Sequence, residues 1–221
     1  MRATRIAISG LSSNVGKTTL LCELLKRNPG WEAIKVSRGH YRSCGRSREA
    51  CCISPLLGSR PLILSGRAET FTRGKDTGRY WQAGASNVHW VICTSEQVEE
   101  GVEGALERVE SEGVLIEGTS LLKCIPVDLS IMVVNPSSEE IKTSAAKAIA
   151  SVNAIYMSES EGAAERLMRL RDRLMRRGQT LGEVPVYEDL SRLAELIGSV
   201  HLARHNGSNI PVGRAGKSLS E

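Results

Sequence analysis

The segment ISGLSSNVGKTTLLCELL, Ile8–Leu25, contains a short apolar run, a loop of small polar residues and a leucine-rich stretch in direct succession. Gly10 and Gly16 allow the backbone of the loop to bend closely around a bound group. The leucines that follow recur at the spacing of a helix face, which predicts that a helix begins where the loop ends. A strand, a glycine-containing loop and a helix in this order are typical of a phosphate-binding loop, whose amides and helix N-terminus point at the anion.

The side chains of this loop suit a nucleoside triphosphate bound together with Mg²⁺. Lys17 supplies a point charge for the terminal phosphates, and the Thr18 hydroxyl is placed to ligate the metal. The spacing differs from the usual G-x4-G-K-[ST], because five residues separate the two glycines. The residues predicted to bind the nucleotide are Gly10, Ser13, Asn14, Val15, Gly16, Lys17, Thr18 and Thr19.

A second protein ligand for the metal is expected, because Mg²⁺ prefers six oxygens. Glu117 follows the apolar run Val114–Ile116 and therefore ends a predicted strand. Parallel α/β proteins bind their ligands at the carboxyl edge of the sheet. A glutamate at the end of a buried strand is costly unless it meets a cation. We therefore predict that Glu117 ligates the metal, the alternative being a solvated carboxylate at a strand end.

Strand-like runs alternate with helical patterns along the rest of the chain. The predicted strands are residues 5–9, 33–37, 88–93, 114–117, 129–134, 154–157 and 184–187, and the predicted helices are 17–26, 76–85, 96–112, 137–150, 162–177 and 189–200. This alternation predicts the α/β class with a mostly parallel sheet, and the continuous apolar strands require helices on both faces. Residues 1–203 form one predicted domain, whereas the aperiodic, polar segment 204–221 is expected to be a disordered tail.

The composition excludes several classes of protein. The chain has 221 residues, 41% of them hydrophobic, which suffices for one sizeable core. No apolar run is long enough to span a membrane and no signal peptide is visible, so we expect a cytoplasmic protein. The net charge is +4, but the basic residues are scattered and aromatic residues make up only 4%, so nucleic-acid binding is not expected. Three of the six cysteines fall in or beside predicted core elements, which favours free thiols over disulfides.

Periodicity fades between residues 38 and 75, apart from an apolar island at Pro61–Leu64. The first half, RGHYRSCGRSREACCISP (Arg38–Pro55), gathers arginines, His40 and three cysteines. It can be a loop for an anionic substrate or a partner protein, a metal site built from the cysteines, or plain surface. Because residues 38–75 follow directly from the predicted strand 33–37, we expect them to form a mobile lid over the site that becomes ordered when ligands bind.

Two resemblances extend this interpretation. GLSSNVGKTTL and VLIEGTSLLKCIPVDLSIMVV are similar to the loop and to the V-E-G-A-G-G strand of dethiobiotin synthetase and the amidating cobyrinate enzymes. AIKVSRGH and GKDTGRYWQAGASNVHWV resemble the molybdopterin-guanine dinucleotide biosynthesis protein B family. Together the matches cover about Arg5–Val134. Both groups are P-loop NTPases, so the resemblance implies a three-layer sandwich and a homodimer.

The resemblance also implies roles for individual residues. Glu117 is the second metal ligand beside Thr18, and Asp76 is a further carboxylate associated with the metal. Lys17 and Lys35 are the implied catalytic residues, since the synthetase keeps a lysine for its carbamate at the position of Lys35. This chain departs from both groups: Thr119-Ser120 replaces the Gly-Gly after the metal-binding glutamate, and SRGH replaces the H-x-H of the molybdopterin family.

Three functions remain open at this point. The match to GKDTGRYWQAGA is the longer one and favours an accessory NTPase of molybdenum-cofactor biosynthesis that docks a partner protein. The alternative is an ATP-dependent ligase or kinase for a small anionic substrate, and a GTPase-like metallochaperone would use Cys51-Cys52 and His40. The guanine signature [NT]-K-x-D is absent after the late strand, so the residues do not choose between ATP and GTP. Asn153 either contacts a base or simply flanks its strand.

Overall fold

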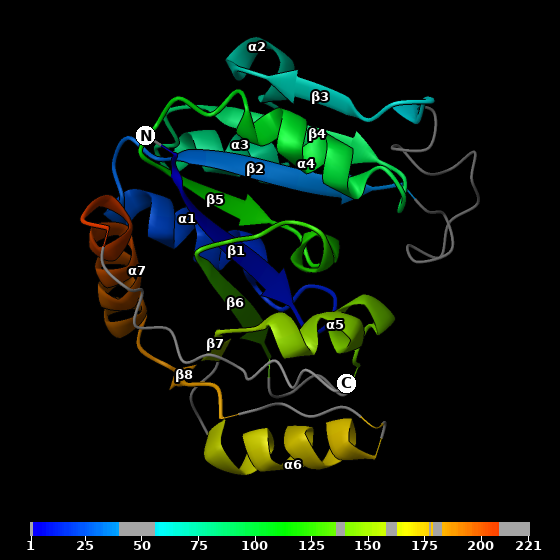
Figure 1. Cartoon of the computed structure of the whole chain (residues 1–221), viewed down its shortest axis with the longest axis vertical. Coiled ribbons are helices and arrows are strands. Elements are labelled where there is room, and N and C mark those ends of the chain that lie inside the picture. The colour runs from blue at the N-terminus through cyan, green and yellow to red at the C-terminus, as the bar shows by residue number, and fades with distance from the viewer. Residues whose placement is uncertain are drawn as a thin grey trace.

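The computed structural model describes residues 2–39, 56–135, 140–157, 163–176, 178 and 183–207. The described strands form one sheet in the order β3-β4-β2-β5-β1-β6-β7-β8 (Figure 1). The strands are β1 (Thr4–Gly10), β2 (Glu32–Arg38), β3 (Leu62–Ser65), β4 (Val88–Cys93), β5 (Gly113–Glu117), β6 (Leu129–Val134), β7 (Ala154–Met157) and β8 (Val186–Tyr187). The helices are α1 (Lys17–Arg27), α2 (Arg67–Thr70), α3 (Asp76–Gln82), α4 (Val98–Leu106), α5 (Thr143–Ala148), α6 (Ala163–Met175) and α7 (Leu190–His205), with the 3-10 turns η2 (Ser120–Lys123) and η3 (Ile149–Ser151).

All neighbouring strands of the sheet are parallel except β3 and β4, which are antiparallel. The predicted α/β class with a mostly parallel sheet is therefore confirmed. Strand β1 lies between β5 and β6, and Ile8 of β1 is paired with Glu117 of β5. The loop after β1 and the end of β5 consequently emerge side by side at the carboxyl edge of the sheet, where ligands of such folds bind.

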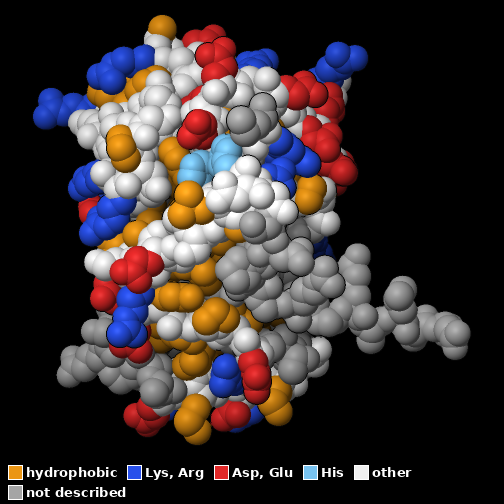
Figure 2. Space-filling model, turned by 60° about the vertical axis from the view of Figure 1, so that its left-hand side comes forward, with side chains coloured by type: hydrophobic (Ala, Val, Ile, Leu, Met, Phe, Trp, Pro, Cys, Tyr) orange, Lys and Arg blue, Asp and Glu red, His pale blue; other side chains and the backbone are white. Residues whose placement is uncertain are grey.

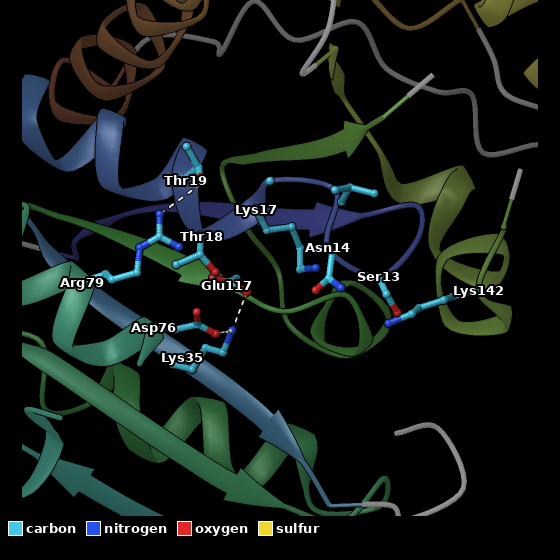
Figure 3. A pocket seen from close by; sticks show the side chains of 12 residues that line it. Ser13, Asn14, Lys17, Thr18, Thr19, Lys35, Asp76, Arg79, Glu117 and Lys142 are labelled. Atoms are coloured by element: carbon cyan, nitrogen blue, oxygen red, sulfur yellow. Dashed lines mark hydrogen bonds and ion pairs between the residues drawn. The ribbon is translucent and has the colours of Figure 1, made fainter. Parts of the chain in front are cut away.

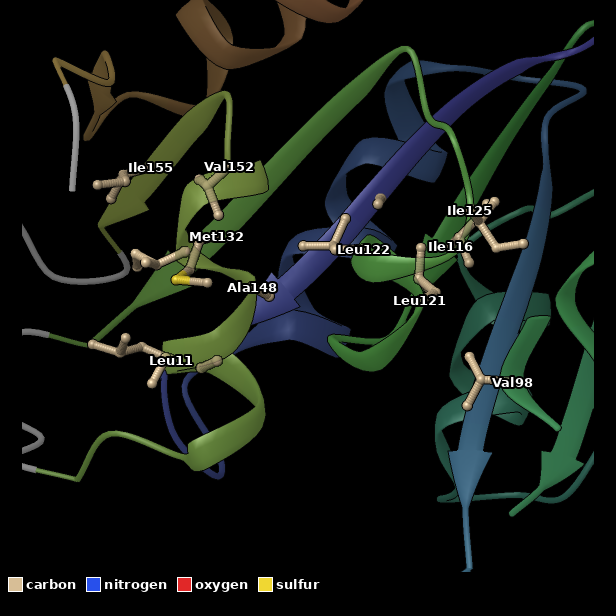
Figure 4. Close-up of a cluster of buried hydrophobic side chains, with 14 of the residues drawn as sticks. Leu11, Val98, Ile116, Leu121, Leu122, Ile125, Met132, Ala148, Val152 and Ile155 are labelled. Atoms are coloured by element: carbon tan, nitrogen blue, oxygen red, sulfur yellow. The ribbon is translucent and has the colours of Figure 1, made fainter. Parts of the chain in front are cut away.

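Helices cover both faces of the sheet, as the apolar strands require. On one face, Leu21 and Leu25 of α1 pack with Tyr80 of α3 and Ile197 of α7. On the other face, α4, η2, α5 and α6 pack on the sheet in a second core. Figure 4 shows part of this second core, in which Leu121 and Leu122 of η2 lie over the sheet. The three-layer arrangement predicted from the sequence is thus confirmed.

The region from residue 38 to 75 differs from the expected structureless lid. Residues 62–65 form β3, which pairs with β4 at the edge of the sheet, and 67–70 form α2. The prediction is therefore wrong for this half of the region. Strand β3 is short and only partly buried on all four residues, so it has no in–out alternation that the sequence could display. His40–Pro55, with its three cysteines, lies outside the described residues.

The ends of several elements also differ from the prediction. The helix expected at 137–150 begins only at Thr143, because Lys142 N–H donates to the carbonyl of Leu11 instead. The last helix continues to His205, beyond the predicted domain end at 203, while residues 208–221 lie outside the described part of the chain. Its predicted start is confirmed, since Asp189 Oδ1 accepts a hydrogen bond of 2.7 Å from Ser191 N.

Two further expectations concern the cysteines, predicted to be free thiols, and the basic residues, predicted to be scattered over the surface. Cys22, Cys93 and Cys124 are free thiols, and burial raises the pKa of Cys22 and of Cys93 to about 11. On the face shown in Figure 2, lysine and arginine side chains are interspersed with acidic ones. None of the helices in the described ranges has the length and apolar character needed to cross a membrane.

Candidate phosphate and metal site

The loop between β1 and α1 turns tightly into the helix. Asn14 and Gly16 both have left-handed backbone conformations, with φ of 54° and 94°, which turn the chain tightly before α1. Gly16 is the N-cap of α1, and neither a capping side chain nor an acidic residue serves the first turn. With no capping side chain in the described part of the chain, the first N–H groups of this 11-residue helix and the positive end of its dipole favour an anion.

Lys17 lies against this loop. A Cβ atom at Gly10 would come within 2.8 Å of both Lys17 Cδ and Val15 Cγ2, so glycine at position 10 leaves room for the lysine stem. Burial lowers the pKa of Lys17, and the charge of Lys35 adds to this effect, whereas Glu117 opposes it. An anion beside the ammonium group would stabilise its charged form.

A pocket of about 400 Å³ opens beside the loop (Figure 3). The residues lining it are Ser13, Asn14, Val15, Gly16, Lys17, Thr18, Thr19, Lys35, Asp76, Arg79, Glu117 and Lys142. They come from the loop, α1, β2, α3, β5 and the segment before α5, elements far apart in sequence. With the exception of Gly10, the residues predicted to bind nucleotide or metal all line this one pocket. Gly10 lines the neighbouring cavity.

Glu117 is the centre of the polar network in this pocket. Its side chain is only 3% exposed. Thr18 Oγ1 donates to Oε2 at 2.8 Å, Tyr80 Oη donates to the same oxygen, and Lys35 Nζ lies 2.5 Å from Oε1. Oxygens bound to neighbouring corners of an octahedral Mg²⁺ at ~2.1 Å lie roughly 3 Å apart. The separation of the Thr18 and Glu117 oxygens therefore fits a shared metal ion.

Lys35 and Asp76 complete the network. Lys35 Nζ lies 2.7 Å from Asp76 Oδ2, so the ammonium group lies between two carboxylates. Burial alone would lower the pKa of Lys35, but the charges of Glu117 and Asp76 outweigh it and the pKa is raised. Burial would raise the pKa of Asp76, yet Lys35 lowers it more. Both groups are therefore charged over the neutral pH range.

Sequence reasoning missed Tyr80 and Lys142. Tyr80 falls four residues after Asp76 in a predicted helix, which places both on one helix face and was a usable signal. Its hydroxyl lies in the core, and burial with the Glu117 charge raises its pKa well above the ordinary value. Nothing local indicated Lys142, which reaches the pocket because its backbone is tied to Leu11.

Two smaller cavities flank the loop. One of about 240 Å³ shares Asn14, Val15, Gly16 and Thr19 with the main pocket and is otherwise lined by Leu20, Glu23, Asn135, Tyr156 and Leu190. The other, of about 200 Å³, lies on the side of Arg38 and Ser144. Asn153 lines neither cavity. It directly precedes β7, and its Oδ1 accepts hydrogen bonds from N and Oγ of Ser130 in the neighbouring strand β6. Of the two alternatives, it therefore flanks its strand.

No protein-family model and no curated protein sequence matches this chain. Among solved structures, the chain is similar to nickel-bound HypB from Helicobacter pylori, with 13% identity over 96% of this chain and 92% of that one, at a TM-score of 0.53. LpxK from Aquifex aeolicus with ATP gives 18% identity and a TM-score of 0.45, over 84% of this chain and 53% of that one. Zn(II)-bound YjiA GTPase from E. coli gives 18% identity and a TM-score of 0.43, over 85% of this chain and 57% of that one.

The similarity to HypB concerns the fold. This chain has the α/β fold of P-loop NTPases, as the loop and the sheet predicted. The comparison supports this broad class and not the narrower group of dethiobiotin synthetase and the molybdopterin family.

Proposed function

We propose that this protein binds a nucleoside triphosphate with Mg²⁺ and cleaves its terminal phosphate. The observation that carries the proposal is the 2.8 Å contact between Thr18 Oγ1 and Glu117 Oε2, in a pocket that Lys17 and the loop residues Ser13–Gly16 also line. Two metal-ligand oxygens, a lysine and a helix N-terminus in one pocket are the parts that phosphoryl transfer requires.

Each residue has a distinct task in this proposal. The amides of the loop and Lys17 hold the terminal phosphates, and Thr18 and Glu117 hold Mg²⁺, which would offset the charge that develops there. Asp76, whose side chain is 43% exposed, faces the same space and is the third candidate ligand. Arg79 donates to Thr19 Oγ1 at 3.1 Å, which holds its guanidinium beside the first turn of α1. Tyr80 and Lys35 position Glu117.

The cavity of about 240 Å³ suits the base and ribose. It continues from the phosphate loop through Asn14, Gly16 and Thr19, and Tyr156 and Leu190 provide apolar surface for a ring. ATP and GTP are the two nucleotides proposed, and direct binding distinguishes them.

Two fuller roles build on this activity. An accessory NTPase of molybdenum-cofactor biosynthesis is favoured by the resemblance of Gly74–Val91, since that segment forms α3 and supplies Asp76, Arg79 and Tyr80 to the site. A ligase or kinase for a small anionic substrate is favoured by the second cavity beside Lys35. We also propose the homodimer and the cytoplasmic location expected from the sequence. The residues that a metallochaperone would use, His40, Cys51 and Cys52, lie outside the described ranges.

Calorimetry with non-hydrolysable ATP and GTP analogues, in Mg²⁺ and in EDTA, tests the proposal. Lys17→Ala should weaken binding at least about tenfold, the effect of one charge-assisted hydrogen bond. Lys26→Ala is the matched control, because Lys26 is an exposed lysine of the same helix paired with Glu23. Equal affinity of Lys17→Ala and the unmodified protein, or no binding of either analogue, would refute the proposal.

A further inference from the structure

The cavity of about 200 Å³ shares four residues with the candidate nucleotide pocket: Lys17, Lys35, Glu117 and Lys142. It opens on their other side, toward the end of β2 and the start of α5. Its remaining side-chain walls include Val36, Arg38, Thr119, Ser120 and Ser144. A molecule in this cavity would therefore lie next to the terminal phosphate of a bound nucleotide.

The charges around this cavity do not balance. Among the residues that line the cavity, Glu117 supplies the carboxylate. Its charge is already neutralised by Lys35, whose Nζ lies 2.5 Å from Oε1. Within the described part of the chain, neither Arg38 nor Lys142 forms an ion pair with a carboxylate. Cations without a partner in a recess favour an anionic occupant, because the recess weakens the screening by water.

Hydroxyl groups add donors to the same cavity. Thr119 Oγ1 accepts from Gly10 N at 3.3 Å, which leaves its own proton to donate. Ser120 and Ser144 also line the cavity and are both partly buried. Hydroxyls combined with a guanidinium recognise the oxygens of a carboxylate or a phosphate.

The two cations that form no ion pair within the described ranges differ in their position. Lys142 lines both this cavity and the nucleotide pocket, whereas Arg38, the last residue of β2, lines this cavity alone among the described pockets. A ligand that contacts both cations at once needs two anionic groups.

We propose that this cavity binds a small molecule with two oxyanions, carboxylate or phosphate, one beside Lys142 and the other held by Arg38. This inference rests on the proposed function, because the ligand is placed beside the terminal phosphate of a bound nucleotide. It specifies the class of the anionic partner and assigns residues to it that the phosphate loop does not use.

The test begins with protein saturated by Mg²⁺ and the non-hydrolysable analogue that binds more tightly. Succinate, glutarate, adipate and phosphoglycolate are then titrated by calorimetry, with butyrate as the monoanionic control. At least one dianion should bind at least about tenfold more tightly than butyrate, as one added charge-assisted bond implies. The dicarboxylates and phosphoglycolate separate a carboxylate from a phosphate at the second position.

Arg38→Gln should remove this preference for a dianion. Arg73→Gln is the matched control, because Arg73 is exposed, lies outside the described pockets and changes the net charge equally. Nucleotide affinity is measured for both variants, so that a folding defect is recognised and Arg38→Lys then replaces Arg38→Gln. Arg38→Lys keeps the charge but not the guanidinium fork, and should weaken dianion binding less.

Three outcomes would overturn the proposal. No dianion of the series binds more tightly than butyrate, or Arg38 and Arg73 substitutions have equal effects, or the dianion binds only by competing with the nucleotide. In each of these cases the nucleotide still binds and the proposed function stands. If the nucleotide itself does not bind in the first step, the proposed function fails and this inference fails with it.

Discussion

Two buried glutamates lie on neighbouring parallel strands, one at the amino edge of the sheet and the other at its carboxyl edge. Glu32 is the first residue of β2 and Glu117 the last residue of β5, and their side chains are 3% exposed in both cases. Each carboxylate has more than one hydrogen-bond donor, as a buried charge requires. They differ in where those donors come from.

Glu32 is held by two backbone amides and one histidine. Oε1 accepts the backbone N–H groups of Glu110 and Ser111, both at 2.8 Å, and His89 Nε2 lies 2.7 Å from Oε2. The other ring nitrogen of His89 lies 2.9 Å from Ser65 Oγ. Burial would raise the pKa of Glu32, but the hydrogen bonds from His89 and from the two amides lower it. This network is closed and joins β2, β3 and β4.

Glu117 is held by side chains, each from a different element. Thr18 comes from α1, Lys35 from β2 and Tyr80 from α3, and the carboxylate also lines a pocket. A side chain can rotate from one hydrogen-bond partner to another, whereas the position of a backbone amide is fixed by the course of the chain. Burial alone therefore does not distinguish these two carboxylates, whereas the nature of their donors and the contact with a pocket do.

The largest expected effect distinguishes the two networks by stability. Glu32→Ala should lower the free energy of unfolding by about 3–5 kcal/mol, because it leaves the buried His89 and two backbone amides without their acceptor. Urea denaturation measures this loss. The nucleotide affinity of the folded variant should be unchanged, since Glu32 lies at the other edge of the sheet.

Glu32→Gln is the control for this variant, because it keeps an acceptor for the amides and should cost less. The stability that Glu32 contributes is present above its ordinary pKa of 4.5 and is lost as the pH falls through its lower folded value. The difference between Glu32→Ala and the unmodified protein should therefore shrink in acid. A loss of nucleotide affinity in Glu32→Ala would contradict the structural role.

Glu117→Gln should instead affect ligand binding. We expect nucleotide affinity in Mg²⁺ to fall by about 1.5–3 kcal/mol, the value of a hydrogen bond to a charged group, with little change in EDTA. Calorimetry under both conditions measures the difference. An equal loss with and without Mg²⁺ would show that Glu117 does not act through the metal.

The third prediction uses pH. Burial lowers the pKa of Lys17 below its ordinary 10.5, and the phosphates need the charged form. Nucleotide affinity should therefore be constant at neutral pH and start to fall before pH 10.5, by up to about tenfold per pH unit. Lys17→Arg should flatten this fall, because arginine keeps its charge. A profile that is the same for both proteins would exclude Lys17 as its origin.

The smallest effect is expected for the most exposed member of the Glu117 network. Asp76→Asn should cost less than about 1 kcal/mol of stability at pH 7. Lys35 still forms its ion pair with Glu117 in this variant, and the side chain of Asp76 is partly solvated. Its pKa is lowered, so its contribution is present above 3.8 and lost as the pH falls through the folded value. Urea denaturation at neutral and acid pH measures this. A loss as large as that of Glu32→Ala would mean that the two networks are alike.

Much of the fold and part of the site could be predicted from local pattern. The strands at 88–93, 129–134 and 154–157 have the predicted bounds, because apolar runs of only four to six residues favour a buried strand over a helix. The position of Glu117 beside the loop could be predicted from its place at a strand end. β3 could not be predicted, because an edge strand with half-buried residues has no pattern that separates it from a loop.

The amino-acid sequence alone carries the alternation of strands and helices, the phosphate loop and the class of fold, because periodicity and loop composition are properties of neighbouring residues. The tertiary structure supplies the contacts of Glu117 with Lys35 and Tyr80, which are 82 and 37 residues away in the chain. It also brings Lys142 and Arg38 to the same recess. Burial and the proximity of charges shift the pKa values of these groups, and both arise only when distant segments pack together.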